Sequence, residues 1–231
     1  MIIGILQTDS VMDRFQSDFG DYPQMFVDLL RGAAPGDIEF RVVDCQRMVY
    51  PAPDSCDAYL ITGSRNSVYE DEAWIKALAE FVDKLLAARR KLVGICFGHQ
   101  LVAHFFGGRT EAVGWAVGVH QCSVVEQAVW MRPALADFAL LSSHQDQVVE
   151  LPAGARLLFS SDFCPVSGYA IGDQVFTLQG HPEFSKAYSR ALMTMRRELL
   201  GADTFERGIR SLNEDTHESE VAAWITNFIA R

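Results

Sequence analysis

Short apolar runs alternate with stretches of helical spacing along the first half of the chain. Met1–Leu6 is almost wholly apolar, and residues 58–62 read Ala-Tyr-Leu-Ile-Thr, which is typical of buried strands. Between such runs, Trp74, Leu78 and Leu85 keep the spacing of one helix face, with acidic residues before them and basic residues after them. We therefore expect βαβ units around a parallel sheet. The expected strands are 1–6, 38–43, 58–62 and 92–95, and the expected helices are 23–30, 73–89 and 98–106.

The second half of the chain has a different pattern, in which strand-like segments follow one another closely. Gly172-Asp173 separates two of them and is a tight-turn signal, so we expect a hairpin there. Asp215 and Glu218 have capping-box spacing and are expected to start a last helix. The expected strands are 117–125, 155–160, 166–171 and 174–178, and the expected helices are 186–200 and 221–229. Since the chain has no internal repeat and no Pro/Gly/Ser linker, the pattern predicts one α/β domain with a mixed sheet.

Composition narrows the classes of protein that fit the chain. Its 231 residues are 49% apolar, which is enough for a sizeable core, and they carry a formal net charge of −10. This acidic balance, without any run of Lys and Arg, argues against nucleic acid or a membrane surface as a partner. The N-terminus lacks the basic region of a signal peptide, and no apolar run approaches the roughly 18 residues that span a bilayer. The five cysteines form no CxxC pair and match no zinc module, so we expect a cytoplasmic protein without disulfides or a metal site.

The most informative stretch is Gly94-Ile95-Cys96-Phe97-Gly98-His99-Gln100. A strand is expected to end at Ile95 and a helix to begin near Gly98, which puts Cys96 on the turn between them. Glycines two residues away on either side let such a turn avoid Cβ clashes, as in a nucleophile elbow. The helix would direct its N-terminus at the sulfur and favour the thiolate, and the Phe97 N–H would form half of an oxyanion hole. A structural turn with a buried cysteine is the alternative.

A second motif, Gln179-Gly180-His181-Pro182-Glu183, directly follows the expected strand 174–178. A thiol nucleophile needs a base, and the base needs an acceptor that orients its other nitrogen. His181 and Glu183 are two positions apart in extended backbone and therefore project to the same side. Glu183 would then hold the imidazole while His181 faces the sulfur of Cys96. A structural histidine followed by an acid is the alternative.

Taken together, Gly-Ile-Cys-Phe-Gly-His-Gln and Gln-Gly-His-Pro-Glu resemble the two motifs of the class I (triad) glutamine amidotransferase domain. The resemblance covers residues 1–200. It implies a single three-layer, flavodoxin-like α/β domain with a mixed, largely parallel sheet, of which residues 201–231 would be a C-terminal helical extension. It also implies a catalytic triad of Cys96, His181 and Glu183.

The segment after the expected strand 58–62 extends the resemblance. It reads Thr-Gly-Ser-Arg-Asn-Ser-Val-Tyr and falls where the family has a Gly-Gly oxyanion loop, and its Ser-Val-Tyr-Glu part is similar to the amidotransferase part of GMP synthases. Ser64 replaces the usual second glycine. Either the Gly63 or the Ser64 N–H would therefore complete the oxyanion hole with Phe97. An ordinary strand-to-helix loop is the alternative.

The expected substrate pocket also rests on the resemblance. Residues 142–146 read Ser-Ser-His-Gln-Asp and fall where the family has a Ser-His-Gly-Asp segment facing the glutamine pocket, with a polar turn as the alternative. Gln145 replaces the glycine and is expected to narrow or reshape the pocket. Trp115 belongs either to the rim of that pocket or to the core. The groups that would hold the amino-acid head of the substrate are the side chain of Gln100 and the backbone around Ser143, His144, Gln145 and Asp146.

The resemblance implies hydrolysis of the side-chain amide of glutamine or another γ-glutamyl compound through a γ-glutamyl thioester, with no metal and no cofactor. Family members either feed ammonia to a synthetase or act alone on γ-glutamyl peptides. The Gly-Trp-x-x-Gly-Val and Ser-His-Gln-Asp segments are closer to the free-standing group, so we expect a hydrolase of a small-molecule substrate. The alternative is the glutaminase subunit of a two-component enzyme of the GMP synthase type. A non-catalytic module is less favoured because the Cys-His-Glu set is intact, and the oligomeric state stays open.

Overall fold

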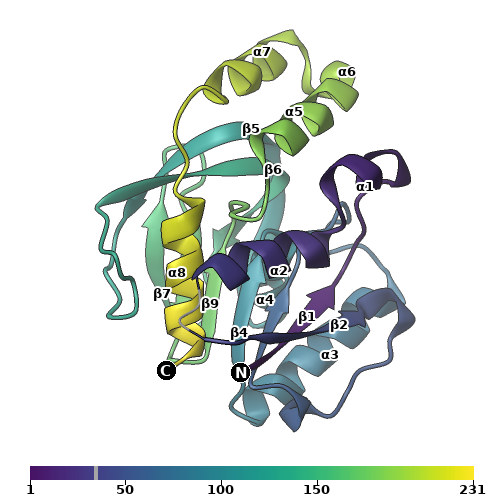
Figure 1. Cartoon of the computed structure of the whole chain (residues 1–231), viewed down its shortest axis with the longest axis vertical. Helices are drawn as coiled ribbons and strands as arrows, with labels where there is room; N and C mark the ends of the chain where they lie inside the picture. Colours follow the sequence, from purple (N-terminus) through teal and green to yellow (C-terminus); the bar gives the residue numbers. More distant parts are fainter. Residues whose placement is uncertain (34–35) are drawn as a thin grey trace.

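The computed structural model describes residues 1–33 and 36–231, which contain one nine-stranded mixed sheet (Figure 1). The strand order is β2-β1-β3-β4-β9-β8-β7-β5-β6. The pairs from β2 to β9 in this order are parallel, and the remaining pairs are antiparallel. The strands are β1 (Ile2–Gln7), β2 (Glu39–Asp44), β3 (Ala58–Ile61), β4 (Lys91–Ile95), β5 (Arg109–Val124), β6 (Asp137–Glu150), β7 (Ala155–Ser160), β8 (Gly168–Ile171) and β9 (Val175–Leu178).

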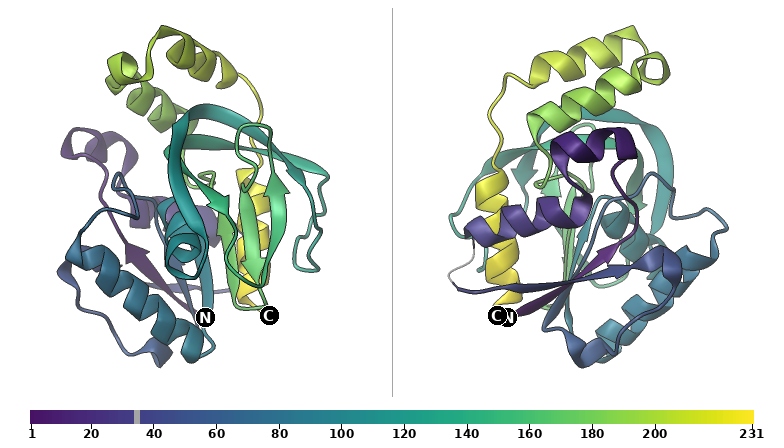
Figure 2. Two further views of the ribbon diagram at one scale, coloured as in Figure 1. Left: turned by 180° about the vertical axis from the view of Figure 1, so that it is seen from behind. Right: turned by 45° about the vertical axis from the view of Figure 1, so that its right-hand side comes forward.

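Helices cover both faces of the parallel part of the sheet and complete a three-layer domain (Figures 1 and 2). The helices α2 and α8 pack together on one face, and α3 and α4 pack on the other. This arrangement confirms the α/β fold class expected from the sequence. The helices are α1 (Asp13–Phe19), α2 (Tyr22–Ala33), α3 (Ala73–Ala87), α4 (Phe97–Phe105), α5 (Lys186–Met195), α6 (Arg197–Leu200), α7 (Ala202–Ser211) and α8 (Glu218–Ile229), with 3₁₀ turns at Cys45–Arg47 and Pro53–Ser55. Within the described ranges, no helix combines the length and the apolar character that crossing a bilayer requires.

Alternation along β1 shows how the sequence forms the two faces of the sheet. Ile3 and Ile5 are fully buried in the cluster that includes α2 and α8, whereas Leu6 is buried in the cluster under α3 and α4. The last helix, α8, adds Trp224 and Phe228 to the first cluster. Because a parallel sheet needs cover on both faces, these contacts make α8 part of the main core.

The antiparallel part of the sheet differs from the expectation. β5 begins at Arg109 instead of 117, and β6 has no counterpart among the expected strands, so the polar turn considered for 142–146 is wrong. The two strands form a long ribbon, paired from Arg109 with Glu150 to Ser123 with Asp137. Polar side chains of β6 face a cavity, and they hide the period-two apolar pattern from which strands are predicted.

The helices differ from the expectation in three ways. The helices α1 and α7 were not expected; each is short and places only two apolar residues against the core, Phe15 and Phe19 in α1 and Phe205 and Ile209 in α7, all of them partly buried. The expected helix 186–200 is divided into α5 and α6 at Arg196, whose backbone (φ −95°, ψ 13°) departs from helical values. The expected capping box is absent, because His217 precedes α8 and its N–H and ring Nδ1 bond to the backbone of Ala139 in β6.

The β8–β9 hairpin confirms the turn predicted at Gly172-Asp173. Ile171 pairs with Val175, and Gly172 has a φ of +54°, which favours glycine. β9 then pairs in parallel with β4 on its other side. This double pairing brings the segment after β9 next to the segment after β4, although they are far apart in the sequence.

Candidate active site

The candidate site lies where the carboxyl ends of four strands meet. Asp9, Gly63, Cys96 and His181 follow β1, β3, β4 and β9 respectively, and all four line one cavity. In open α/β sheets, ligands bind at this edge, outside the carboxyl ends of the strands. The structure therefore brings together the two motifs that the sequence singled out.

Cys96 occupies the sharp turn between β4 and α4 with a φ of +50°, which is rare for a residue with a side chain. Its N–H donates to the Leu178 carbonyl of β9 at 2.8 Å. Only glycine fits at the two flanking positions. A Cβ on Gly94 would come within 2.7 Å of the Gly98 carbonyl, and a Cβ on Gly98 would come within 2.7 Å of the Ile61 Cβ. The Gly-x-Cys-x-Gly motif thus holds Cys96 in strained backbone at the N-terminus of a helix.

His181 and Glu183 form a buried pair beside this turn. The Nδ1 of His181 is 2.7 Å from a carboxylate oxygen of Glu183, and the His181 N–H donates to the Leu141 carbonyl of β6 at 2.8 Å. A Cβ on Gly63 would lie 2.9 Å from the Cε1 of His181 and 3.6 Å from the Cβ of Cys96. The imidazole and the thiol therefore flank the same glycine, and no larger residue fits between them at that position.

The surroundings of His181 set its charge. Burial lowers the pKa of the imidazole, but the Glu183 carboxylate and the Cys96 sulfur outweigh burial and raise it to about 10. Burial instead lowers the pKa of His99 and of His144 to about 3, and neither ring has a carboxylate at hydrogen-bond distance. His181 is therefore protonated near neutral pH, while the other two buried histidines are neutral.

Three backbone amides near Cys96 have no acceptor within the described part of the chain: those of Phe97, the first residue of α4, and of Gly63 and Ser64 after β3. The carbonyl of Gly63 is held by the hydroxyls of Thr8 (2.8 Å) and Thr62 (3.2 Å). Because the peptide bond is trans, the Ser64 N–H points away from these threonines. Ser64 lines the cavity that contains Cys96.

A polar lobe of the cavity extends from Cys96 toward β6, and the five residues expected around a substrate head group all line it. Gln100 donates from Nε2 to the Asp146 carbonyl (2.8 Å) and to Oε1 of Gln179 (3.1 Å). The Asp146 carboxylate accepts from the hydroxyls of Ser67 and Tyr69. These bonds tie α4, β6, β9 and the loop after β3 together. The expected residues in the polar lobe are Gln100, Ser143, His144, Gln145 and Asp146.

No sequence pattern indicated Arg196, which borders the same lobe. Its guanidinium donates to the Ser143 hydroxyl at 2.9 Å and lies over the Trp115 ring, 5.5 Å from its centre. No carboxylate of the described residues pairs with it. Trp115 lines the cavity and is also partly buried against an apolar cluster, so it contributes both to the rim and to the packing beneath it.

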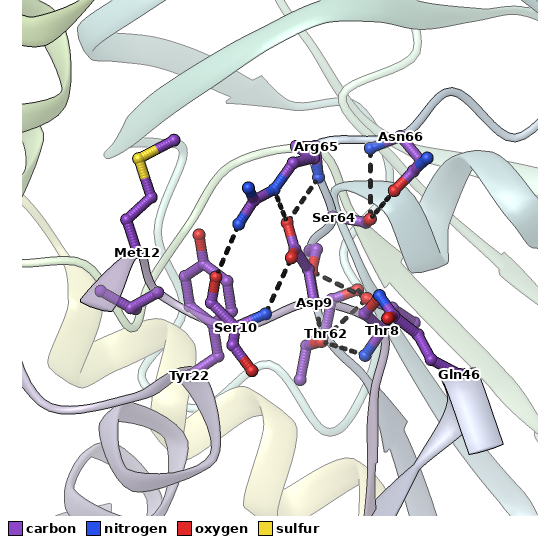
Figure 3. Close-up of polar contacts among 12 residues, drawn as sticks. Thr8, Asp9, Ser10, Met12, Tyr22, Gln46, Thr62, Ser64, Arg65 and Asn66 are labelled. Carbon is purple, nitrogen blue, oxygen red and sulfur yellow. Dashed lines mark hydrogen bonds and ion pairs between the residues drawn. The ribbon is translucent and has the colours of Figure 1, made fainter. Parts of the chain in front are cut away.

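An ion pair that the sequence also did not indicate stands opposite Arg196. The buried Asp9 carboxylate accepts from the Arg65 side chain (2.7 Å) and from the Arg65 backbone N–H (3.1 Å), as Figure 3 shows. The same guanidinium also donates to the Ser10 carbonyl at 2.9 Å. These bonds fix the loop that carries Gly63 and Ser64. Across residues 1–33 and 36–231, no group of three or more His, Cys, Asp and Glu side chains is placed to hold a metal ion.

Comparisons with known proteins identify the family. The model of the class-I glutamine amidotransferase family matches residues 23–196, and the chain belongs to this family. It is 34% identical over 176 residues to gamma-glutamyl peptidase 3 of Arabidopsis thaliana, covering 73% of this chain and 71% of that protein. It is 33% identical over 219 residues to a glutamine amidotransferase-like protein of Schizosaccharomyces pombe, covering 88% and 86%.

Other similarities are partial or concern the fold alone. A glutamine-hydrolyzing GMP synthase of Finegoldia magna is 29% identical over 126 residues, which cover 54% of this chain and 24% of that protein. The crystal structure of a glutamine amidotransferase from Thermotoga maritima superposes with a TM-score of 0.74 at 19% identity and covers 99% of both chains. A glutamine amidotransferase structure from Methylobacillus flagellatus gives the same TM-score at 20% identity. The structural matches confirm the amidotransferase fold.

Proposed function

We propose that the protein is a cysteine hydrolase that cleaves the side-chain amide of γ-glutamyl compounds through a γ-glutamyl thioester. The observation that carries this proposal is the 2.7 Å hydrogen bond between His181 and Glu183 beside Cys96 on its strand-to-helix turn. A nucleophile, a base and an acceptor that orients the base are the parts that such a reaction needs. The similarity to a gamma-glutamyl peptidase at 34% identity supports the γ-glutamyl class of substrate.

The reaction has two halves. In the first, the Cys96 thiolate attacks the side-chain carbonyl carbon, and protonated His181 gives its proton to the amine nitrogen as the C–N bond breaks. In the second, the neutral imidazole takes a proton from water, which attacks the thioester and releases glutamate and the thiolate. Glu183 occupies Nδ1 of the ring, which leaves Nε2 for both proton transfers. The raised pKa of His181 supports a resting site in which the imidazole carries the proton.

The tetrahedral oxyanion is stabilised by the amides of Phe97 and Ser64. Both lack an acceptor among the described residues, and the Gly63 carbonyl, held by two threonines, turns the Ser64 N–H away from them at a residue that lines the cavity. We assign the Ser64 amide, and not that of Gly63, to the oxyanion hole. Because the donor is backbone, the replacement of the family's second glycine by serine costs no hydrogen bond.

The polar lobe matches the charges of an amino-acid head group. Asp146 supplies a carboxylate for the α-ammonium, and Oε1 of Gln100, which has no partner among the described residues, adds a second acceptor. Arg196, which has no carboxylate partner among the described residues, supplies the cation for the α-carboxylate. The neutral His144 ring supports this wall by bonding to the Asp146 carbonyl at 3.2 Å.

The function is tested by product release from the pure chain. Glutamine, glutathione and γ-glutamyl amines are supplied separately, and free glutamate is measured for the wild type and for Cys96→Ala. The proposal predicts glutamate release by the wild type and none above background by the variant, with equal thermal unfolding of the two. Release that persists in Cys96→Ala for every substrate accepted by the wild type would show that Cys96 is not the nucleophile.

A second candidate function is that of a glutaminase subunit that delivers ammonia to a separate synthetase. It is favoured by the partial similarity to GMP synthase. The same assay separates the two functions, because a subunit of this kind hydrolyses glutamine only after its synthetase is added. Hydrolysis of γ-glutamyl peptides by the chain alone supports the first function.

We also assign the enzyme to a reducing compartment, such as the cytoplasm. All five cysteines are unpaired, and the proposed nucleophile is active only as a thiol or thiolate. Treatment with peroxide is expected to inactivate the enzyme, and a thiol reductant is expected to restore activity after mild exposure. Retention of full activity after stoichiometric oxidation of Cys96 would contradict this assignment.

A further inference from the structure

We propose that a second, aromatic lobe of the cavity is a leaving-group subsite for amino acids with apolar side chains. The proposal rests on the function proposed above, since it concerns the part of the same substrate beyond the scissile bond. The enzyme would then prefer γ-glutamyl conjugates of such amino acids to free glutamine. The residues that define the aromatic lobe are Met12, Tyr22, Phe184, Tyr188 and Leu192.

The aromatic lobe begins at His181. The Phe184 ring stacks on the imidazole, with ring centres 3.9 Å apart and planes 12° apart. Tyr22 stacks on Phe184 at 6.1 Å, and Tyr188 meets the Phe184 ring edge-on at 4.8 Å. Because the leaving nitrogen takes its proton from His181, the group attached to that nitrogen lies along this aromatic wall. The wall is therefore in contact with the leaving group and not with the glutamyl head.

The two lobes differ in most of their lining and share only Ser64, Arg65, Cys96, Ser143 and Arg196. The polar lobe presents Gln100, Asp146 and Arg196, which suit a zwitterionic head group. The aromatic lobe presents aromatic rings together with the apolar side chains of Met12 and Leu192. Ammonia, the leaving group of glutamine, has no apolar surface and gains nothing from such a wall. An apolar side chain on the leaving amine is removed from water when it packs against this wall, and the resulting binding energy persists in the transition state.

The hydroxyls of the lobe favour an amino acid over a simple hydrocarbon amine. The hydroxyls of Tyr22 and Tyr188 are 3.1 Å apart, so one of them donates to the other. The accepting hydroxyl keeps its own hydrogen, for which the described residues offer no acceptor. A carbonyl or carboxylate oxygen of the leaving amino acid can accept that hydrogen. Arg65, whose side chain is half exposed at the mouth of the same cavity, adds a cation for a carboxylate.

The test compares kcat/KM for γ-glutamyl-phenylalanine with kcat/KM for glutamine. We expect a ratio of at least about 10 for the wild type, since even one methylene group in an apolar pocket changes selectivity by about 10- to 200-fold. Tyr22→Ala removes one ring of the wall and is expected to lower the ratio about tenfold. Tyr22→Phe keeps the ring and is expected to lower it less. Tyr50→Ala is the matched control: Tyr50 stacks on Phe81 at 4.5 Å outside the cavity, so the ratio should stay at the wild-type value.

The outcomes separate the subsite from the function. Cys96-dependent hydrolysis with equal kcat/KM for both substrates would overturn the subsite and leave the function standing, as would equal ratios for Tyr22→Ala and Tyr50→Ala. If neither substrate is hydrolysed in a Cys96-dependent way, the proposed function is wrong and the subsite falls with it. If Tyr22→Ala does not fold, Met12→Ala decides in its place, because Met12 is on a loop and is only partly buried. An unchanged ratio in Met12→Ala would then overturn the subsite.

Discussion

The parallel and antiparallel halves of the sheet contribute to the site in different ways. In the parallel half, Gly63 and Cys96 come within two residues of a strand end, and close glycine contacts fix their positions. In the antiparallel half, the cavity wall lies in the middle of β6, where Val117 pairs with Ser143 and Ala116 pairs with His144. The groups proposed for the chemistry are thus positioned by the backbone next to a strand end. The groups proposed for binding on β6 are positioned by the register in which β6 pairs with β5.

This difference predicts two kinds of mutational effect. Changes at the carboxyl ends of the parallel strands and of β9 should lower kcat by large factors. Changes on the wall formed by β6 and the end of α5 should raise KM and leave kcat nearly unchanged. A large loss of kcat caused by a change on the wall formed by β6 and the end of α5 would contradict this division between the two halves of the sheet.

The largest effect is expected for Glu183→Gln. The variant keeps the shape of the side chain but removes the charge that holds His181 in its protonated state and orientation, so we expect kcat to fall by about 10²- to 10⁴-fold. Steady-state kinetics on a γ-glutamyl substrate give kcat and KM separately. A fall of less than threefold would mean that Glu183 has only a structural role.

Gly63→Ala is expected to lower kcat by about 100-fold. The added methyl group would lie 2.9 Å from the His181 ring and would displace it from Cys96. Gly32→Ala is the matched control, because a Cβ at Gly32 meets no atom within 4 Å. Wild-type kcat in Gly63→Ala, measured alongside this control, would contradict the tight packing of the imidazole against the loop.

Arg196→Met should raise KM by about 10- to 100-fold and change kcat by less than about threefold, since it removes the cation proposed for the α-carboxylate. Arg197→Met is the control. That arginine lies over Phe205 at 4.9 Å and does not line the cavity, so its KM should stay at the wild-type value. Equal KM values for the two variants would remove Arg196 from the binding site.

The last prediction concerns stability and not activity. Because the folded-state pKa of His181 is raised from 6.5 to about 10, its contribution to the free energy of unfolding is fully present below pH 6.5 and is lost as the pH rises toward 10. The wild type should therefore lose stability relative to His181→Gln as the pH rises across this window, by up to roughly 1 kcal/mol per pH unit. Urea unfolding at several pH values measures both proteins. Parallel pH profiles would contradict the raised pKa.

What could be predicted from the sequence follows the same division. The turn at Cys96 was predictable because Gly94 and Gly98 make a local steric signal. The His181–Glu183 pair was predicted for extended backbone, but Pro182 and Glu183 lie in a turn, so the pair forms by a different local geometry than the expected one. The strand β6 was not predictable, since cavity-facing polar residues interrupt its apolar pattern. The place of Arg196 in the site could not be predicted either, because it depends on the break between α5 and α6 and on contacts with β5 and β6.

The aromatic lobe was hidden from the sequence for a related reason. Tyr22 follows Asp21 at the start of α2, where it looks like an ordinary first-turn residue, and Phe184 and Tyr188 look like core positions of the segment that enters α5. Only the fold brings them together, since Tyr22 and Tyr188 are separated by 166 positions in the chain. Residues that bind through tertiary contacts alone leave no local pattern.

The central claim is that Cys96 carries a γ-glutamyl thioester during turnover. The direct measurement is rapid acid quench of the wild type with a saturating γ-glutamyl substrate, followed by intact-protein and peptide mass spectrometry. We predict the added mass of one γ-glutamyl acyl group on the peptide that contains Cys96, and no such addition in Cys96→Ala. An acyl group on a different residue, or full turnover by a protein whose Cys96 is blocked by alkylation, would contradict the account.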